Sequence, residues 1–351
     1  MAKPHIAVVG AGLMGHGIAQ VFALGGHDVT ITDALAANLD TVEARILANL
    51  KDLGDDERAV ARVSPKRDLA EAVCDADFVV EAVTEDLPLK QKLFAEIERH
   101  VRENAILASN TSVIPITAIM HGLQHRERAL GTHWWNPPYL VPLVEVIGTE
   151  WTSPRAIEWT MALHAAAGKK PAHVKKDVPG FIGNRLQHAL WREAISLVER
   201  GICDAETVDT VIKAAFGRRL AVLGPLENAD LVGTDLTLAI HGTVLPDIES
   251  TPGPSPYLER LVAAGKLGFK SGEGFRKWSA AEQAALRSRV VQHLRKARDL
   301  DPPHGEERPQ GASRTMRPRS SFETGAPHHE EQAKRSSRRA RPPQDEGGEA
   351  P

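Results

Sequence analysis

The sequence predicts an α/β fold with a doubly wound, mostly parallel sheet, followed by an all-α C-terminal domain. A short apolar strand leads directly into a glycine-rich turn and an apolar helix, and a second strand then ends in an acidic residue. Further short apolar runs alternate with helix-length segments up to about residue 180, which is typical of parallel sheets buried on both faces. Beyond that point, helical segments follow one another without strands.

Composition narrows the classes of function. The 351 residues carry a net charge of −3, so neither a nucleic-acid partner nor a membrane surface is expected. The two cysteines, Cys74 and Cys203, lack the spacing of metal ligands. No apolar run approaches the roughly 20 residues of a membrane helix, and the chain passes from MAKPH into a strand without a signal peptide. We therefore expect a cytoplasmic protein without a metal site.

The beginning of the chain has the pattern of a Rossmann-type nucleotide-binding unit. His5–Val9 is predicted as a strand, Ile18–Leu24 as a helix, and His27–Thr32 as a second strand that ends at Asp33. Glycines between strand and helix allow a tight turn and the approach of a pyrophosphate. An acid after the second strand accepts hydrogen bonds from ribose hydroxyls and repels a 2′-phosphate, which favours NAD over NADP. The predicted cofactor contacts are Asp33 and the turn residues Gly10, Ala11, Gly12, Leu13, Met14 and Gly15.

The middle of the first half continues the alternation of helices and strands. Helices are predicted at Leu39–Leu53 and Glu85–Val101, and strands at Val63–Asp68, Asp77–Val83 and Ala105–Ala108. Ligands collect beyond the carboxyl ends of strands in open α/β sheets.

Ser112 follows the last of these strands. It is therefore placed to offer its hydroxyl to a ligand, and the alternative is a helix N-cap before Ile114–Met120.

The segment from Gly131 to Val146 carries one histidine, His133, and one carboxylate, Glu145, among apolar and aromatic residues. A buried carboxylate is costly unless it is paired, and the loop after Trp134 can return Glu145 to the imidazole. A carboxylate on one ring nitrogen fixes the tautomer and leaves the other as a proton acceptor. The pair is predicted to be a general base with its orienting acid; a structural pair under an aromatic cap is the alternative.

The second half is predicted to be helical. After a helix at Trp159–Ala167 and a strand at Lys170–Val174, helices are expected at Ile182–Arg200, Ala205–Phe216, Glu227–Ile240, Ser255–Ala264 and Ser279–Asp299. Asn184 lies near the joint of the two halves, where clefts are common, and is either a substrate contact or a capping side chain. Lys270, in a glycine-rich loop, is either an anion contact or part of a surface turn.

Several motifs resemble the L-3-hydroxyacyl-CoA dehydrogenase family from about Lys3 to Trp278. They are GAGLMGHGIAQ, DFVVEAVTEDLPLKQKLF, ASNTS, GTHWWNP with LVEV, KKDVPGFIGNRL and KLGFKSGEGF, in the family's order and at close to its spacing. The resemblance implies that His133 is the catalytic base with Glu145 as its acid, and that Ser112 and Asn184 contact the substrate. It also implies fatty-acid metabolism, a homodimer formed by the C-terminal helices, and cofactor contacts through the glycine turn, Asp33, Glu85, Lys90, Ser112 and Lys270.

The resemblance and the patterns together give four parts of the chain. We expect an NAD-binding Rossmann domain at 1–180, an all-α domain for substrate binding and dimerisation at 181–280, and an exposed helix at 281–299. A disordered tail is expected at 300–351, where proline, glycine, serine and charged residues dominate.

Departures from the family concern the substrate. The lysine-rich hairpin that helps acyl-CoA enzymes of the family to hold CoA is shorter here and reads LGDDE, and Val113 replaces a second serine. The segments NPPYLVP and VLGPLENADLVGTD are more similar to the L-gulonate 3-dehydrogenase (lambda-crystallin) group and to a pyridine-carboxylate dehydrogenase of vitamin B6 breakdown.

The predicted function is an NAD-dependent oxidoreductase that oxidises the hydroxyl of a 3-hydroxyacyl compound, on CoA or free. One alternative is a small carboxylated alcohol or aldehyde, gulonate-, carnitine- or pyridine-carboxylate-like. An aromatic substrate would fit Trp134, Trp135 and Tyr139 near the base. The alternative of another class is an inactive NAD-binding structural relative.

Overall fold

The structure is a computed structural model that describes residues 3–300. Apart from Leu300, the tail predicted at 300–351 lies outside the described residues. Among the described residues, no helix is long and apolar enough to cross a membrane.

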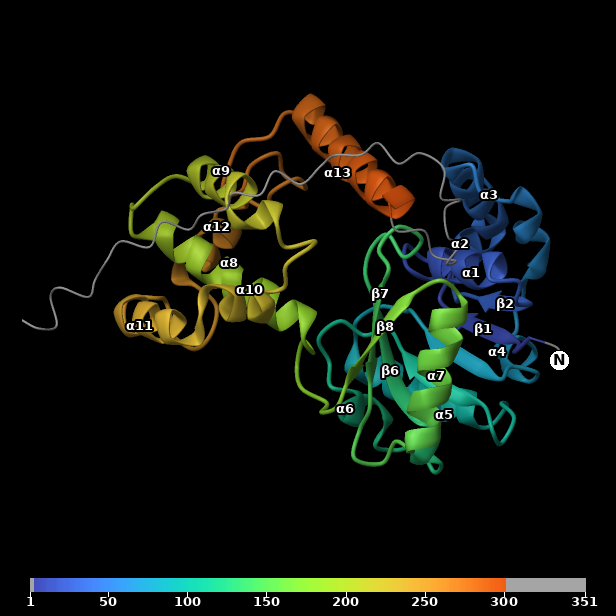
Figure 1. The fold of residues 1–351 in the computed structure, drawn as a ribbon. Helices are drawn as coiled ribbons and strands as arrows, with labels where there is room; N and C mark the ends of the chain where they lie inside the picture. The colour runs from blue at the N-terminus through green and yellow to red at the C-terminus, as the bar shows by residue number, and fades with distance from the viewer. Residues whose placement is uncertain (1–2, 301–351) are drawn as a thin grey trace, which may run out of the picture. The chain divides into compact units, whose positions relative to one another are not determined.

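The first half is built around one eight-stranded sheet with the order β3-β2-β1-β4-β5-β6-β7-β8 (Figure 1). Strands β1 to β6 run parallel, whereas β7 runs antiparallel to β6 and parallel to β8. The strands are β1 (Ile6–Val9), β2 (Val29–Thr32), β3 (Val63–Pro65), β4 (Phe78–Glu81), β5 (Ile106–Ser109), β6 (Ala129–Trp134), β7 (Leu143–Ile147) and β8 (Lys170–Val174). The strand order reverses between β1 and β4, which is where open α/β sheets bind ligands. The predicted fold class is confirmed.

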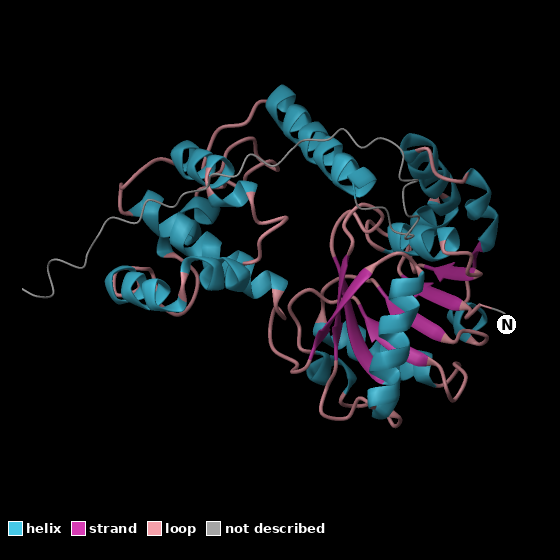
Figure 2. Ribbon diagram, in the orientation of Figure 1, coloured by secondary structure: helices cyan, strands magenta, loops and turns pink. Residues whose placement is uncertain are grey.

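Helices cover both faces of this sheet (Figure 2). They are α1 (Gly15–Leu24), α2 (Ala36–Asp40), α3 (Val42–Leu53), α4 (Leu69–Val73), α5 (Leu87–Glu98), α6 (Ile116–Met120) and α7 (Pro154–Ala166), with 3-10 turns η1 (Glu57–Arg62) and η2 (Arg126–Arg128). Alternate residues of β1 belong to two separate apolar clusters, Ile6 and Val8 to one and Ala7 and Val9 to the other. Because side chains alternate along a strand, the sheet is buried on both sides.

Three helices differ from the prediction. The helix expected at Leu39–Leu53 is two helices, α2 and α3, which meet at Thr41, whose hydroxyl donates to the carbonyl of Ala37 at 2.9 Å. Helix α4 was not predicted, because five residues are too few to show a helical period. The helix expected at Glu227–Ile240 is interrupted at Gly233, where φ is +99°.

The second half is helical, as predicted. It contains α8 (Gly183–Glu199), α9 (Ala205–Ala214), η3 (Phe216–Arg218), α10 (Pro225–Val232), α11 (Thr234–Val244), α12 (Pro256–Ala263) and α13 (Ala280–Leu300). Unlike the helices on the sheet, α9, α10, α11 and α13 bury none of their described side chains.

Candidate active site

His133 and Glu145 face each other across two neighbouring strands. The antiparallel register of β6 and β7 places them directly opposite one another. Nδ1 of His133 lies 2.7 Å from Oε2 of Glu145, and the side chains are almost buried, at 4% and 1% exposure. The contact expected from the sequence is therefore present, because an antiparallel pair brings residues twelve positions apart onto the same face of the sheet.

The second oxygen of Glu145 holds the beginning of α8. Oε1 accepts the backbone N–H groups of Ile182 at 2.9 Å and Gly183 at 3.0 Å. Burial by itself would raise the pKa of Glu145, but the hydrogen bonds from His133, Gly183 and Ile182 together hold this pKa below its usual value. Glu145 is thus a carboxylate at neutral pH, and it joins the histidine to the helical half. Sequence reasoning missed this second role.

Two aromatic rings contact the imidazole of His133. Trp135 lies 5.3 Å away between ring centroids, and Phe181 lies 5.6 Å away. With Glu145 ionised, Nδ1 of His133 carries the hydrogen and Nε2 keeps its lone pair. Within residues 3–300, Nε2 of His133 makes no hydrogen bond, so it is the nitrogen that can exchange a proton with a reactant.

The three aromatic side chains expected near the base do not gather there. Trp134 points to the other face of β6, because neighbouring residues of a strand alternate, and it packs 5.2 Å from His164. Tyr139 contacts α1 at Gly17, where an added Cβ would lie 3.2 Å from Cδ1 of the tyrosine. Of the three, Trp135 alone contacts His133, so the argument for an aromatic substrate loses two of its three residues.

Ser112 and Asn184 meet, although they are far apart in the sequence. Nδ2 of Asn184, in the first turn of α8, donates to the carbonyl of Ser112 at 2.9 Å. The N-cap of α6 is Pro115, so the interpretation of Ser112 as the cap of this helix is wrong.

Glu85 fixes the segment that carries Ser112. Its Oε1 accepts the hydroxyl of Thr111 at 2.6 Å and the N–H of Ser112 at 2.9 Å. Burial would raise the pKa of Glu85, but the hydrogen bond from Thr111, the charge of Lys90 and the backbone donors lower it. Lys90 itself is 1% exposed, and its ammonium lies 2.6 Å from Glu81 and 3.4 Å from Glu85. The ammonium is therefore available to Glu85 but not to solvent.

The glycine turn has room for a phosphate group. Gly10 has φ +108°, and a Cβ at this position would lie 2.6 Å from the carbonyl oxygen of Ala82, so a side chain does not fit. A Cβ at Gly12 would meet no described residue within 4 Å, which leaves the space above the turn open. Among residues 3–300, no side chain caps the first turn of α1, and the N–H groups at a helix start suit the pyrophosphate of a dinucleotide.

Two charged side chains hold this turn. Asp33, just after β2, accepts the N–H of Ala11 at 2.7 Å. Arg45 of α3 donates to the carbonyl of Ala11 at 2.6 Å and lies 3.4 Å from that of Gly12. Arg45 was not predicted, since a single basic residue in an amphipathic helix gives no sequence signal of its own.

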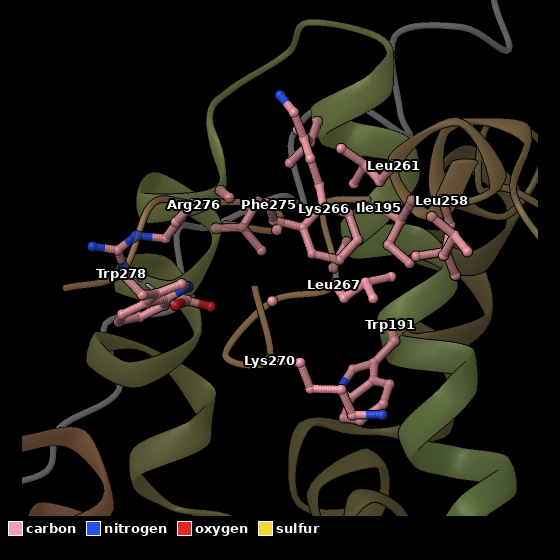
Figure 3. A pocket seen from close by; sticks show the side chains of 18 residues that line it. Trp191, Ile195, Leu258, Leu261, Lys266, Leu267, Lys270, Phe275, Arg276 and Trp278 are labelled. Atoms are coloured by element: carbon pink, nitrogen blue, oxygen red, sulfur yellow. Dashed lines mark ion pairs between the residues drawn. The ribbon is translucent and has the colours of Figure 1, made fainter. Parts of the chain in front are cut away.

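Lys270 lies in the helical half. It lines a cavity of about 610 Å³ together with Trp191, Leu258, Phe275 and Trp278 (Figure 3). No cluster suited to a metal ion occurs within the part of the chain that the structure describes.

Family models match both halves of the chain. The NAD-binding domain of 3-hydroxyacyl-CoA dehydrogenase matches residues 5–178, and the C-terminal domain of the same family matches residues 180–278. The chain belongs to the 3-hydroxyacyl-CoA dehydrogenase family. The family predicted from the motifs is confirmed, and with it NAD as the cofactor and dehydrogenation as the class of reaction.

Members of this family with different substrates resemble the chain. The 5-formyl-3-hydroxy-2-methylpyridine 4-carboxylate 5-dehydrogenase of Mesorhizobium japonicum is 34% identical over 83% of this chain and 96% of its own length. The mitochondrial hydroxyacyl-coenzyme A dehydrogenase of Homo sapiens is 39% identical over 78% of this chain and 91% of its own. A crystal structure of a dehydrogenase of the first kind, described as an NAD⁺-dependent dismutase, has a TM-score of 0.79 at 33% identity, covering 86% of this chain and 98% of that one.

Proposed function

We propose that this dehydrogenase oxidises a substrate hydroxyl with His133 as the general base. The observation that carries the proposal is the pairing of His133 with the ionised Glu145, which leaves Nε2 free. Nε2 takes the hydroxyl proton as the carbinol carbon gives up a hydride and becomes a carbonyl carbon. Glu145 orients the ring and balances the charge of the imidazolium. Ser112 and Asn184 hold the reacting oxygen.

Bound NAD would supply the hydride acceptor. We propose that residues 1–180 hold it, with the glycine turn and the start of α1 at the pyrophosphate and Asp33 at the adenosine ribose. Glu85 and Ser112 lie at the carboxyl edge of the neighbouring strands, and Lys90 acts on this edge through Glu85. Lys270 is proposed as a cofactor contact from the domain at 181–280.

The proposed substrate is a 3-hydroxy acid unit, carried on CoA or free. One observation favours a free, small carboxylated substrate. At the end of α3 and in η1, the basic side chains Lys51 and Arg58, which could hold phosphates, already pair with Glu57 and Asp56. Arg295 and Arg298 of α13 pair with Asp52 and Asp55 of the same region. The relative from Mesorhizobium japonicum, named for a pyridine carboxylate, is consistent with this second candidate.

A substrate panel tests the proposal. Acetoacetyl-CoA, free 3-hydroxy acids and pyridine carboxylates would each be assayed with NAD(H) and NADP(H). We expect turnover in one class and a clear preference for NAD. Comparable kcat/KM with NADP would contradict the role of Asp33, and tight NADH binding without turnover across the panel would favour an inactive relative.

We also propose a homodimer that forms through the helical half and acts in the cytoplasm. Large apolar side chains stay exposed on η3, α10 and α11 and between them: Phe216, Leu220, Val222, Leu226, Leu231, Val232, Leu236, Leu238 and Ile240. An apolar surface of this extent is typical of a protein interface. Replacing Leu231 and Leu238 by Glu should convert the dimer to a monomer, measured by light scattering. If the double variant and the wild type have the same mass, the proposal is contradicted.

A further inference from the structure

Glu145 fixes one end of the imidazole of His133, and aromatic contacts limit the rest of the ring. A single hydrogen bond at Nδ1 sets the position of that nitrogen but lets the ring plane turn about the bond. The indole of Trp135 and the ring of Phe181 contact this plane at centroid distances of 5.3 and 5.6 Å. Phe181 is itself immobilised, because it is fully buried. Of the two rings that contact His133, the indole of Trp135 is therefore the one that can move.

The indole of Trp135 occupies the space that a side chain at position 183 would need. A Cβ built on Gly183 would lie 2.5 Å from Cζ2 of Trp135 and 3.3 Å from its Cε2. Real Cβ atoms do not approach a ring carbon that closely, so the indole would have to move. Gly183 does not have a positive φ, so its backbone conformation suits residues other than glycine, and the three heavy atoms nearest to the added Cβ all belong to the indole.

The backbone at residue 183 cannot retreat instead. Its N–H donates to Oε1 of Glu145 at 3.0 Å, and the other oxygen of the same carboxylate holds His133. Withdrawing the start of α8 would break that hydrogen bond and disturb the acid that orients the histidine. A side chain at 183 must therefore displace either the indole of Trp135 or the carboxylate of Glu145, and both of these contact His133.

We propose that Trp135 and Gly183 form a size-matched pair that positions His133, with Trp135 as the positioning residue and Gly183 as the gap that admits it. This inference rests on the proposed role of His133 as the base. It identifies the first residue of α8 as a place where one methyl group changes the geometry of the reaction without touching the cofactor turn.

Four variants of the full chain test the pair: Gly183→Ala, Trp135→Phe, the double variant and Gly122→Ala. Gly122 is the matched control, because an added Cβ there meets nothing within 4 Å in the described part of the chain and its φ is not positive. Gly183→Ala should lower kcat on the order of tenfold, since small misplacements of reacting groups reduce rates strongly. NADH affinity, measured by fluorescence, should stay unchanged, and Gly122→Ala should behave as the wild type.

The double variant decides whether the indole is responsible. Phenylalanine lacks the fused ring edge that meets the Cβ, so Gly183→Ala combined with Trp135→Phe should be as active as Trp135→Phe alone. The inference is overturned if Gly183→Ala is as active as Gly122→Ala, or if the double variant is clearly less active than Trp135→Phe alone. Should Gly183→Ala fail to fold, Trp135→Leu examines the contact from the other side: it should lower kcat without weakening NADH binding, and an unchanged kcat would overturn the inference. If His133→Ala keeps its turnover, the proposed function fails instead, whatever happens at position 183.

Discussion

Two of the buried histidines in the NAD-binding half, His133 and His164, are in opposite situations. His133 hydrogen-bonds a carboxylate from the next strand. His164, in α7, places Nδ1 2.8 Å from the backbone carbonyl of Thr160 in its own helix. Aromatic rings surround His164, with Phe22 and Phe78 at 5.6 Å and Trp134 at 5.2 Å between centroids. Its Nε2 is buried without a hydrogen-bond partner among the described residues.

The difference between the two histidines shows what makes an imidazole a base. Burial lowers the pKa of His164 to about 4, with a smaller contribution from the positive charge of Lys169, although the hydrogen bond to Thr160 acts in the opposite direction. Within residues 3–300, the groups that shift the pKa of His164 include no acid, so a proton there has no counter-charge. His133 has an anionic partner and a free nitrogen. Both are needed for a ring to accept a proton and hold it during a reaction.

The largest expected effect on turnover separates the two residues directly. His133→Ala should lower kcat by roughly 10²- to 10⁴-fold, the usual contribution of a positioned acid–base group. His164→Leu should leave kcat close to that of the wild type, because the ring lies on the other side of β6. Steady-state kinetics and thermal unfolding of both variants would show it. Near-wild-type turnover of a folded His133→Ala protein would remove the distinction between the two rings.

Features that depend on residues close together in the sequence were predicted better than features that depend on tertiary contacts. The strand, turn and helix around Gly10 follow from short-range patterns, and the pairing of His133 with Glu145 follows from a chain that folds back on itself. The position of His164 does not follow, because a histidine within an apolar helix pattern gives no sign of the rings around it. Because side chains alternate along a strand, the sequence does allow the prediction that Trp134 and Trp135 point to opposite faces.

The hydrogen bonds between the two halves could not be predicted from spacing. Glu145 accepts the amides of Ile182 and Gly183, which lie nearly forty positions further along the chain, and backbone amides have no signature in the sequence. The burial of Lys90 was missed for a related reason. A lysine on an amphipathic helix is expected in solvent, and only the fold brings it next to Glu81 and Glu85.

The intermediate effect is expected from removing only the charge of the partner acid. Glu145→Gln keeps the size of the side chain, but its amide can donate to Nδ1, which would move the imidazole hydrogen to Nε2. We expect kcat to fall on the order of 10²-fold, because the ring then lacks its acceptor nitrogen and its counter-charge. NADH affinity should be nearly unchanged. Equal losses of kcat and NADH affinity would show that Glu145 supports the fold rather than the base.

The smallest effect on turnover belongs to His164, where stability should change instead. In the unfolded chain His164 takes up a proton below about pH 6.5, whereas in the folded protein it does so only near pH 4. The unfolded state therefore binds more protons between these values, and the free energy of unfolding falls as the pH drops through this window. The loss from this one group amounts to at most about 3 kcal/mol, from the separation of the two pKa values.

His164→Leu removes this titration and fills the same aromatic pocket. Denaturant unfolding at a series of pH values should show a flatter decline of stability between about pH 6.5 and 4 for the variant than for the wild type. If the wild type and His164→Leu lose stability in parallel between about pH 6.5 and 4, His164 is not a neutral buried histidine. The loss of stability in acid then has another origin.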